Sequence, residues 1–233
     1  MTKEQLTLEL EKMGIKNPQL VSDKLETLME ETLATNKLFN LTAIKDENKF
    51  RELMLLDSVY PHLCVNFEDK KIIDVGTGAG YPGLVLASLC DSNFTLLDST
   101  NKKVQFCSNF ASKNGLKHVN CVCGRAEEYV LKHREQYDIA TARAVSDLNV
   151  LLELVLPLVK VNGYFIAMKG SKGLQELESS KEMLKKLGGV VEQIFEFELP
   201  ESKEKRINIV IKKTSQTPKK YPRQYSEIIK SNG

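Results

Sequence analysis

The chain has 233 residues, of which 42% are hydrophobic and 27% charged, and its formal net charge is +2 at pH 7. This length suits one large domain or a moderate domain with an appendage, and it is enough to bury a substantial core. No apolar run approaches the roughly 18 residues of a membrane span, and the first residues lack the layout of a signal peptide, so we expect a cytoplasmic protein that does not enter a membrane.

Residues 1–68 are predicted to form a helical extension that packs on the rest of the chain. Pro18 is a good first helical residue, and apolar side chains then recur at helical spacing as far as Leu33. Asp46 can cap a second helix that closes at Pro61. Residues 39–44, between the two helices, are predicted to be a loop with buried apolar anchors. Both helices need an apolar surface to cover, and the remainder of the chain can supply one.

Residues 69–213 alternate strand and helix signals, which is the pattern of a parallel sheet with right-handed crossovers. Five alternating strands are predicted at 72–75, 94–98, 119–123, 137–141 and 164–168, followed by a helix at 174–187 and strands at 190–199 and 206–212. The short polar link between the last two strands predicts an antiparallel hairpin. We therefore predict an α/β fold with a Rossmann-like seven-stranded methyltransferase sheet, mostly parallel, with an antiparallel C-terminal hairpin strand.

Two of the intervening helices carry explicit boundary signals. Asn101 can cap a helix that ends at Gly115. Ser146 can cap a strongly apolar helix that continues through Val159 and stops at Asn162 and Gly163.

A glycine-rich turn follows the first predicted strand. Gly76 and Gly78 alternate with other residues along it, and Asp74 lies two residues before the first glycine. Glycine lets the backbone turn sharply and approach a ligand, and a strand, a glycine turn and a helix start are typical of a nucleotide pocket. A dinucleotide fingerprint fits only in a register that begins late, at Gly78, with a proline inside it. The acid before the first glycine favours a cationic ligand instead. We therefore predict S-adenosylmethionine, bound through Asp74, Gly76 and Gly78, with a dinucleotide as the alternative.

Ligands of an open parallel sheet bind beyond the carboxyl ends of its strands. Asp98 ends the second strand, about where an acid meets ribose hydroxyls, and Ala126 and Glu127 after the third are placed for the adenine edge. Arg143 and Lys169 end the fourth and fifth strands, where cations suit an anionic substrate or the methionine carboxylate of the cofactor. Structural alternatives remain open: a helix cap for Asp98, a first-turn helix acid for Glu127, and surface ion pairs for the two cations.

The chain lacks the motifs of two common base methylations. Methylation of an exocyclic adenine amine favours Asn-Pro-Pro-aromatic after the fourth strand, where residues 140–143 read Ala-Thr-Ala-Arg. Methylation of pyrimidine C5 needs a thiolate near the fourth and fifth strands, and no cysteine follows Cys123. Guanine N7 needs neither device, because it carries a free lone pair and loses no proton on attack. We therefore predict N7 as the acceptor, with Arg143 and Lys169 as the catalytic residues that fix its approach.

The cysteines and histidines give no sign of a metal site. The chain has five cysteines and three histidines, scattered and without a Cys-x-x-Cys pair. We expect buried free thiols in a reducing cytoplasm and no bound metal.

Residues 214–233 form a basic tail in which proline, serine and tyrosine lie among the cations. This composition fits either a solvated disordered tail or an arm that contacts nucleic-acid phosphates. In the second interpretation Lys219, Lys220 and Arg223 bind RNA, together with Lys169 and Arg206 of the sheet. Removing the tail would then weaken RNA binding and hardly change the affinity for the cofactor.

Together these motifs resemble the RsmG family, also called glucose-inhibited division protein B, whose members are bacterial methyltransferases acting on N7 of a guanosine in 16S ribosomal RNA. The resemblance covers nearly the whole chain in the right order, through residues 39–44, 56–58, 74–83, 97–99, 102–103, 124–128, 141–144, 168–170 and 220–223.

The resemblance implies a set of roles. The residues that it places on the cofactor are Gly76, Tyr81, Ala126, Glu127 and Arg143, with Asp98 on the ribose. The expected partner is 16S ribosomal RNA or a small-subunit assembly intermediate, and we expect a monomer. The alternatives are a methyltransferase with a small-molecule or protein substrate and a cofactor-binding regulator without catalysis.

The chain departs from the family pattern at two places. Leu53 and Met54 stand where the family usually has Arg-His, and the residues after Arg223 differ from the commoner family ending. The roles of both segments in this chain are therefore open.

Overall fold

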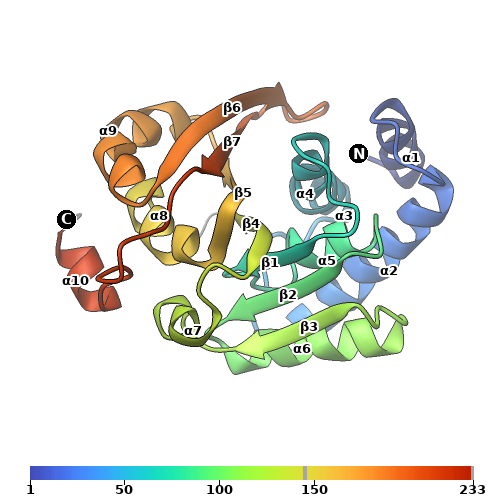
Figure 1. Ribbon diagram of the computed structural model, residues 1–233. Coiled ribbons are helices and arrows are strands. Elements are labelled where there is room, and N and C mark those ends of the chain that lie inside the picture. The colour runs from blue at the N-terminus through green and yellow to red at the C-terminus, as the bar shows by residue number, and fades with distance from the viewer. Residues whose placement is uncertain (144–145, 232–233) are drawn as a thin grey trace.

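The computed structural model describes residues 1–143 and 146–231, and it is built on one seven-stranded sheet (Figure 1). The strand order is β3-β2-β1-β4-β5-β7-β6. The strands are β1 (Lys71–Val75), β2 (Asn93–Asp98), β3 (Val119–Cys123), β4 (Tyr137–Arg143), β5 (Val159–Lys169), β6 (Gly189–Glu198) and β7 (Lys205–Lys213). The first five run parallel, whereas β7 lies antiparallel between β5 and β6. The predicted fold class, including the antiparallel hairpin, is confirmed.

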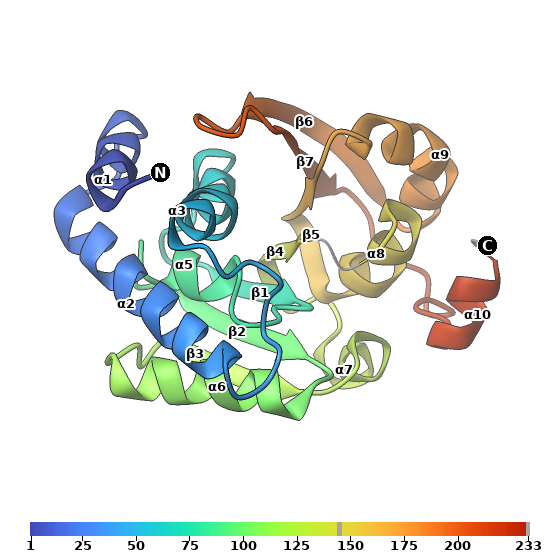
Figure 2. The ribbon, with the colours of Figure 1, turned by 180° about the vertical axis from the view of Figure 1, so that it is seen from behind.

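Two groups of helices cover the two faces of this sheet. The first group is α1 (Lys3–Lys12), α2 (Pro18–Asn36), α3 (Glu47–Phe50), η1 (Arg51–Leu56), α4 (Asp57–Val59), η2 (Tyr60–Leu63), α5 (Gly83–Ala87) and α6 (Asn101–Lys113). The second group is α7 (Ala126–His133), α8 (Leu148–Val155), η3 (Leu156–Leu158), α9 (Gly173–Lys186) and α10 (Tyr225–Lys230). Figure 2 shows the first group on the left and the second on the right, with the termini at opposite ends.

Each group encloses its own apolar core, because successive residues of a strand point to opposite faces of the sheet. Ile72 of β1 packs in the core of the first group, and its neighbour Ile73 packs in the core of the second. The apolar α8 needs burial along most of its surface, and every one of its residues except Asn149 is buried or nearly so. Packing on both faces holds the carboxyl ends of β1, β2, β4 and β5 at one edge, where the predicted site residues lie.

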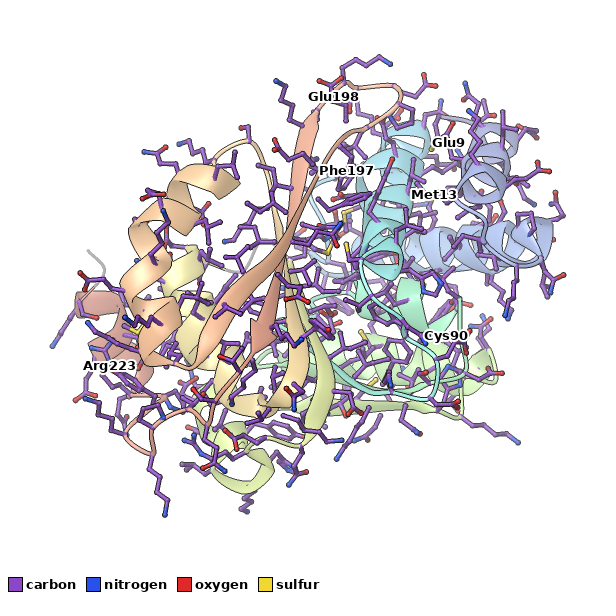
Figure 3. All side chains as sticks on the ribbon, turned by 45° about the horizontal axis from the view of Figure 1, so that its top comes forward. Glu9, Met13, Cys90, Phe197, Glu198 and Arg223 are labelled. Carbon is purple, nitrogen blue, oxygen red and sulfur yellow. The ribbon has the colours of Figure 1, made fainter. Side chains whose placement is uncertain are left out.

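The N-terminal helices are tied to the far end of the sheet as well as to its face. The buried carboxylate of Glu52 in η1 accepts hydrogen bonds from the backbone amides of Glu201 and Ser202, in the turn between β6 and β7, at 2.6 and 3.0 Å. Tyr60 stacks on Phe197 of β6 with ring centroids 3.6 Å apart, and Figure 3 shows Phe197 pointing from β6 toward these helices. The division at residue 68 stays a prediction, because contacts across it are extensive.

Several elements differ from the sequence-based predictions. α1 was not predicted, because only Leu6 and Leu10 of this polar segment are buried; Thr2 caps it through a reciprocal pair with Gln5. The predicted helix through Val159 is wrong, since it ends at Val155, Pro157 lies in the short turn η3 that follows, and Val159 already begins β5.

The caps also differ. Asp147, not Ser146, caps α8, and Asn101 is the first residue of α6 rather than its cap. The helix expected to close at Pro61 continues to Leu63. Of the motif at residues 141–144, residue 144 lies outside the described part of the chain. No helix within 1–143 or 146–231 has both the length and the apolar character that a membrane crossing needs.

Candidate functional site

The backbone conformation of the glycine turn after β1 leaves its peptides open to free space. Gly76, Gly78 and Gly80 have φ of 72°, 58° and 90°, the left-handed region that favours glycine. The amide of Gly78 donates to Oδ2 of Asp98 at 2.9 Å, which fixes the turn on the end of β2. A Cβ on Gly78 would meet no atom within 4 Å, so this peptide borders free space. A ligand can therefore approach the backbone here without displacing a side chain.

Asp74 supports this turn from inside the fold. Its side chain has no exposed surface, and its oxygens accept the amide of Gly83 at 3.0 Å and the hydroxyl of Thr141 at 2.9 Å. Burial raises the pKa of Asp74 to about 6, against hydrogen bonds that favour the carboxylate. The geometry thus disagrees with a direct contact between Asp74 and a cationic ligand: the carboxylate shapes the turn that faces the ligand.

Asp98 borders a cavity of about 400 Å³ beyond the ends of β2 and β3. Its Oδ1 accepts the amide of Thr100 at 2.8 Å, so both oxygens are oriented by backbone amides. Ala126 and Glu127, at the start of α7, line the same cavity. The structure therefore brings together the three residues predicted for the ribose and adenine. Leu154 of α8 and Tyr225 of α10 also line it, and no motif in the sequence pointed to either.

A second cavity of about 750 Å³ lies beyond the ends of β1, β4 and β5. Gly76 and Arg143 line both cavities, so the two adjoin at these residues. Its other lining residues include Gly78, Tyr81 and Lys169, and also residues that the analysis of the sequence did not assign to it: Leu41, Ile44, Leu53, Met54, Asp57, Met168, Glu176 and Asn208. The loop with apolar anchors and the Leu53-Met54 departure thus both border the site.

Arg143 contacts three residues of the N-terminal extension and the ring of Tyr81. Its Nη1 donates to the carbonyl oxygen of Leu53 at 3.2 Å and lies 3.6 Å from Oδ2 of Asp57. Its Nη2 lies 3.3 Å from the sulfur of Met54, and its guanidinium lies 5.6 Å from the ring centre of Tyr81. Burial lowers the pKa of Arg143 and raises that of Asp57, and their mutual attraction opposes both shifts. The pair is therefore a buried ion pair that sets the position of the guanidinium.

The other predicted cations of this edge are paired as well. Lys169 lies 2.8 Å from Glu176 and donates to the carbonyl oxygen of Ser146 at 2.6 Å. Arg206 contacts Asp57 at 3.4 Å and Glu204 at 2.8 Å. Each of these cations already has a carboxylate partner, so an RNA phosphate would have to compete with that partner, and the RNA contacts of Lys169 and Arg206 stay predictions. Their ion pairs make the cavity a mixed-charge site.

Tyr81 presents its ring, and not its hydroxyl, to the site. The residue is buried, its hydroxyl is 2.8 Å from that of Thr32 in α2, and its ring meets Phe50 edge to face. Tyr81 can contact a ligand only through the ring.

The basic tail is neither disordered nor near the larger cavity. Arg223 lies 2.6 Å from Glu153 of α8, and Figure 3 places Arg223 on the side of the molecule away from Glu9 of α1 and from Met13, which follows α1. Ile228 is fully buried against α8. Lys219 and Lys220 are exposed. The disordered alternative is therefore wrong for residues 214–231. Of the three tail cations predicted to bind RNA, Arg223 is paired with a carboxylate.

The thiols and the acids form no metal centre in the part of the chain that the structure covers. No group of three or more His, Cys, Asp or Glu side chains within it could hold an ion. The five cysteines are free; Cys90 and Cys107 are buried as expected, Cys64 and Cys121 are half-buried, and Cys123 is exposed, contrary to expectation.

The two adjoining cavities fit S-adenosylmethionine. The smaller has the oriented acid and the open backbone that a nucleoside needs. The larger has both signs of charge, which suits a methionine end that carries a carboxylate, an ammonium group and the sulfonium. A dinucleotide would place a pyrophosphate at this turn, where the amide of Gly78 already donates to the carboxylate of Asp98, and that carboxylate repels a second anion.

The sequence model of the family described as rRNA small subunit methyltransferase G matches residues 21–208. The chain belongs to this family. Relatives named ribosomal RNA small subunit methyltransferase G include one from Fusobacterium nucleatum, 41% identical over 92% of this chain and 93% of that protein. One from Staphylococcus aureus is 40% identical over 96% and 95%, and one from Bacillus licheniformis 39% over 96% and 95%. The resemblance read from the motifs is confirmed.

Solved structures agree on the fold of this small subunit methyltransferase G family member. A SAM-dependent methyltransferase from Aquifex aeolicus superposes with a TM-score of 0.56 and 17% identity, over 77% of this chain and 97% of that one. The solved structure of a Bacillus halodurans protein superposes with a TM-score of 0.55 and 14% identity, over 69% of this chain and 100% of that one. At such identities the likeness concerns the fold alone.

Proposed function

We propose that this protein transfers the methyl group of S-adenosylmethionine to N7 of a guanosine in 16S ribosomal RNA. Family membership supports an rRNA methyltransferase with this cofactor. The observation that supports N7 is the make-up of the larger cavity. Its described lining residues include no cysteine and no histidine. Of its three acids, Asp57 and Glu176 are engaged in ion pairs, and Asp147 caps α8 by accepting the amide of Asn149 at 3.0 Å. Such a site is poor in bases and nucleophiles, and N7 needs neither.

In this proposal the residues of the chain act by position and charge. The bound cofactor supplies a methyl group on a sulfonium. Asp98 and the glycine turn hold its nucleoside in the smaller cavity, and the Arg143–Asp57 and Lys169–Glu176 pairs hold its methionine end. The target base enters the larger cavity unstacked, as enzymes acting on bases commonly require. Asn208 also lines this cavity. Its amide nitrogen contacts the sulfur of Cys64 at 3.8 Å, and we propose that its amide oxygen accepts a hydrogen bond from the base edge.

We propose that RNA phosphates bind to cations outside this cavity, because the cations that line it are already paired with carboxylates. Exposed lysines are found in the loop after α2, whose Leu41 and Ile44 line the cavity, and in α6: Lys37, Lys45 and Lys102. Lys102 also lies 5.9 Å from the ring centre of Phe39 in that loop. We propose that these lysines, with Lys219 and Lys220, take the phosphate contacts that the sequence assigned to Lys169, Arg206 and Arg223.

Nucleoside analysis of 16S RNA tests this function. RNA from cells that lack the gene should lose one N7-methylguanosine, and a plasmid copy of the wild-type gene should restore it. The purified protein should then methylate RNA or small subunits from the deletion strain. An unchanged nucleoside content with cofactor binding intact would indicate a small-molecule or protein substrate. Unchanged content together with no transfer to any cell extract would indicate a regulator without catalysis.

A further inference from the structure

The C-terminal segment packs on the core next to the smaller cavity, called the nucleoside cavity below because we propose that it holds the nucleoside of the cofactor. Arg134, just after α7, donates to the carbonyl oxygens of Thr217, at 3.2 Å, and of Tyr221. Lys213 at the end of β7 is fully buried and bonds Glu135 at 2.8 Å, and Glu135 also accepts the amide of Thr217 at 3.1 Å. These contacts determine where the chain leaves the sheet and direct it across α7 toward α8.

Arg223 then anchors the segment on α8. Glu153 has no exposed surface, and Arg223 supplies its backbone amide at 2.7 Å, Nε at 2.9 Å and Nη2 at 2.6 Å. A buried carboxylate without such partners is strongly unfavourable, so Glu153 and Arg223 require each other. Two residues further on, α10 begins and buries Ile228 against the same core. The position of α10 is thus set by contacts independent of any ligand.

This anchoring places Tyr225 in the wall of the nucleoside cavity. Tyr225 lines it together with Asp98, Ala126 and Leu154, the residue next to Glu153. Tyr225 is 36% exposed, and the guanidinium of Arg125 lies 5.7 Å from the centre of its ring. An aromatic ring that is fixed at one end and open toward a cavity offers a flat surface for a base, and any base has a face that can stack on it.

We infer that Tyr225 is a binding residue for the adenine of the cofactor and that residues 218–230 are part of the cofactor site. The inference rests on the proposed cofactor-dependent function. It differs from the expectation drawn from the sequence, in which removing the tail hardly changes the affinity for the cofactor. It also gives a role to the part of the chain that departs from the family ending.

Calorimetric titration of the full-length protein tests the inference. Tyr225→Ala should weaken binding of S-adenosylmethionine roughly tenfold, the lower range for loss of a base–aromatic stack. Tyr225→Phe, which keeps the ring, should bind like wild type. Ile229→Ala is the matched control, because Ile229 belongs to the same helix and is 42% exposed. The affinity for 5′-methylthioadenosine, which lacks the methionine carboxylate, should fall by the same factor in Tyr225→Ala, since the ring would contact only the nucleoside.

Hydrogen exchange supplies a second readout. Amides of residues 224–231 should exchange more slowly when wild-type protein is saturated with the cofactor, and this protection should disappear in Tyr225→Ala. Equal affinity of Tyr225→Ala and wild type, or no protection of this segment, would overturn the inference. Unchanged cofactor affinity combined with weakened RNA binding would restore the RNA arm. Failure of wild type itself to bind the cofactor would refute the proposed function instead.

Discussion

Nη1 of Arg143 and Oδ2 of Asp57 lie 3.6 Å apart and join the end of strand β4 to the N-terminal helices. Asp57 also forms an ion pair with Arg206 of β7, at 3.4 Å. One carboxylate on α4 therefore contacts residues of two strands, β4 and β7, at the larger cavity. Both residues of the first pair are nearly buried. Because this cluster lines the cavity, the stability of the fold and the geometry of the site depend on the same contact.

Asp57→Asn should be strongly destabilising. It would leave two guanidinium groups with less compensation in a buried setting, and breaking a buried pair from one side costs about 3–5 kcal/mol. Urea unfolding measures the free energy of unfolding directly. Glu204→Gln is the control, because Glu204 contacts Arg206 from the exposed side and surface pairs contribute roughly 1 kcal/mol or less. Similar losses in the two variants would contradict the assigned role of Asp57.

Gly78→Ala should impair cofactor binding more than stability. The methyl group would project into free space where the cofactor approaches, and φ of 58° adds backbone strain of about 1–2 kcal/mol. Gly115→Ala separates the two effects, because Gly115 has φ of 71° and equally free space but lies at the end of α6. Both variants should lose similar stability, and only Gly78→Ala should bind S-adenosylmethionine more weakly. An unchanged dissociation constant in folded Gly78→Ala would remove this turn from the cofactor site.

Asp74→Asn should alter how stability depends on pH. Burial raises the folded pKa of Asp74 to about 6, above the ~3.9 of an unfolded aspartate. The contribution of this carboxyl group to stability is complete below the unfolded pKa and is lost as pH rises through the folded one. Relative to the variant, wild type should lose up to about 3 kcal/mol between roughly pH 4 and 7.

Asp138→Asn is the opposite control for Asp74. Burial of Asp138, which would raise its pKa, is outweighed by its bonds to Lys160 and to the amide of Lys71, so the pKa is lowered. The contribution of this group is therefore present above its unfolded pKa and changes only in more acidic solution. Unfolding at pH 5, 6 and 7 should show a changing difference for Asp74→Asn and a constant one for Asp138→Asn. A constant difference for both would show that Asp74 ionises normally.

Methyl transfer should be nearly independent of pH above neutrality. N7 loses no proton, so no general base has to ionise, and the single-turnover rate should stay flat between roughly pH 7 and 8.5. Below that range protonation of Asp74 would loosen the glycine turn. Rapid-quench measurement with saturating cofactor gives the chemical step. A rate that rises tenfold per pH unit in this window would indicate a catalytic base and a different acceptor atom.

Lys169→Met should lower the rate of methyl transfer by roughly 100-fold through lost positioning, although Lys169 moves no proton. Its partner provides the comparison: Glu176→Gln keeps the ammonium group of Lys169, so the rate of methyl transfer should fall less in this variant. Single-turnover rates at saturating cofactor and RNA, with circular dichroism to verify the fold, decide the matter. Normal turnover in Lys169→Met would reduce this lysine to a structural ion pair.

Local sequence was sufficient for most of the fold and for the nucleoside half of the site. The glycine turn, Asp98 and residues 126–127 follow directly from strand ends, and periodicity places strand ends to within a few residues. Helix α1 is not predicted from the sequence, because two buried leucines in ten residues give a weak periodic pattern. Helix α8 was drawn too long because apolar residues continue beyond Val155 into β5, and periodicity does not distinguish a buried helix from a buried strand.

Only the tertiary structure decided which charges are free and which are paired. Asp57 meets Arg206 from 149 positions away, and Glu153 meets Arg223 from 70 positions away. No local pattern records such pairs, because they depend on how helices pack across the sheet and on the burial that makes a lone charge costly. For that reason the sequence by itself could place Arg143 and Lys169 at the ends of their strands and Arg223 in the tail. Their partners, and the position of Tyr225 in the wall of the smaller cavity, depend on the tertiary structure.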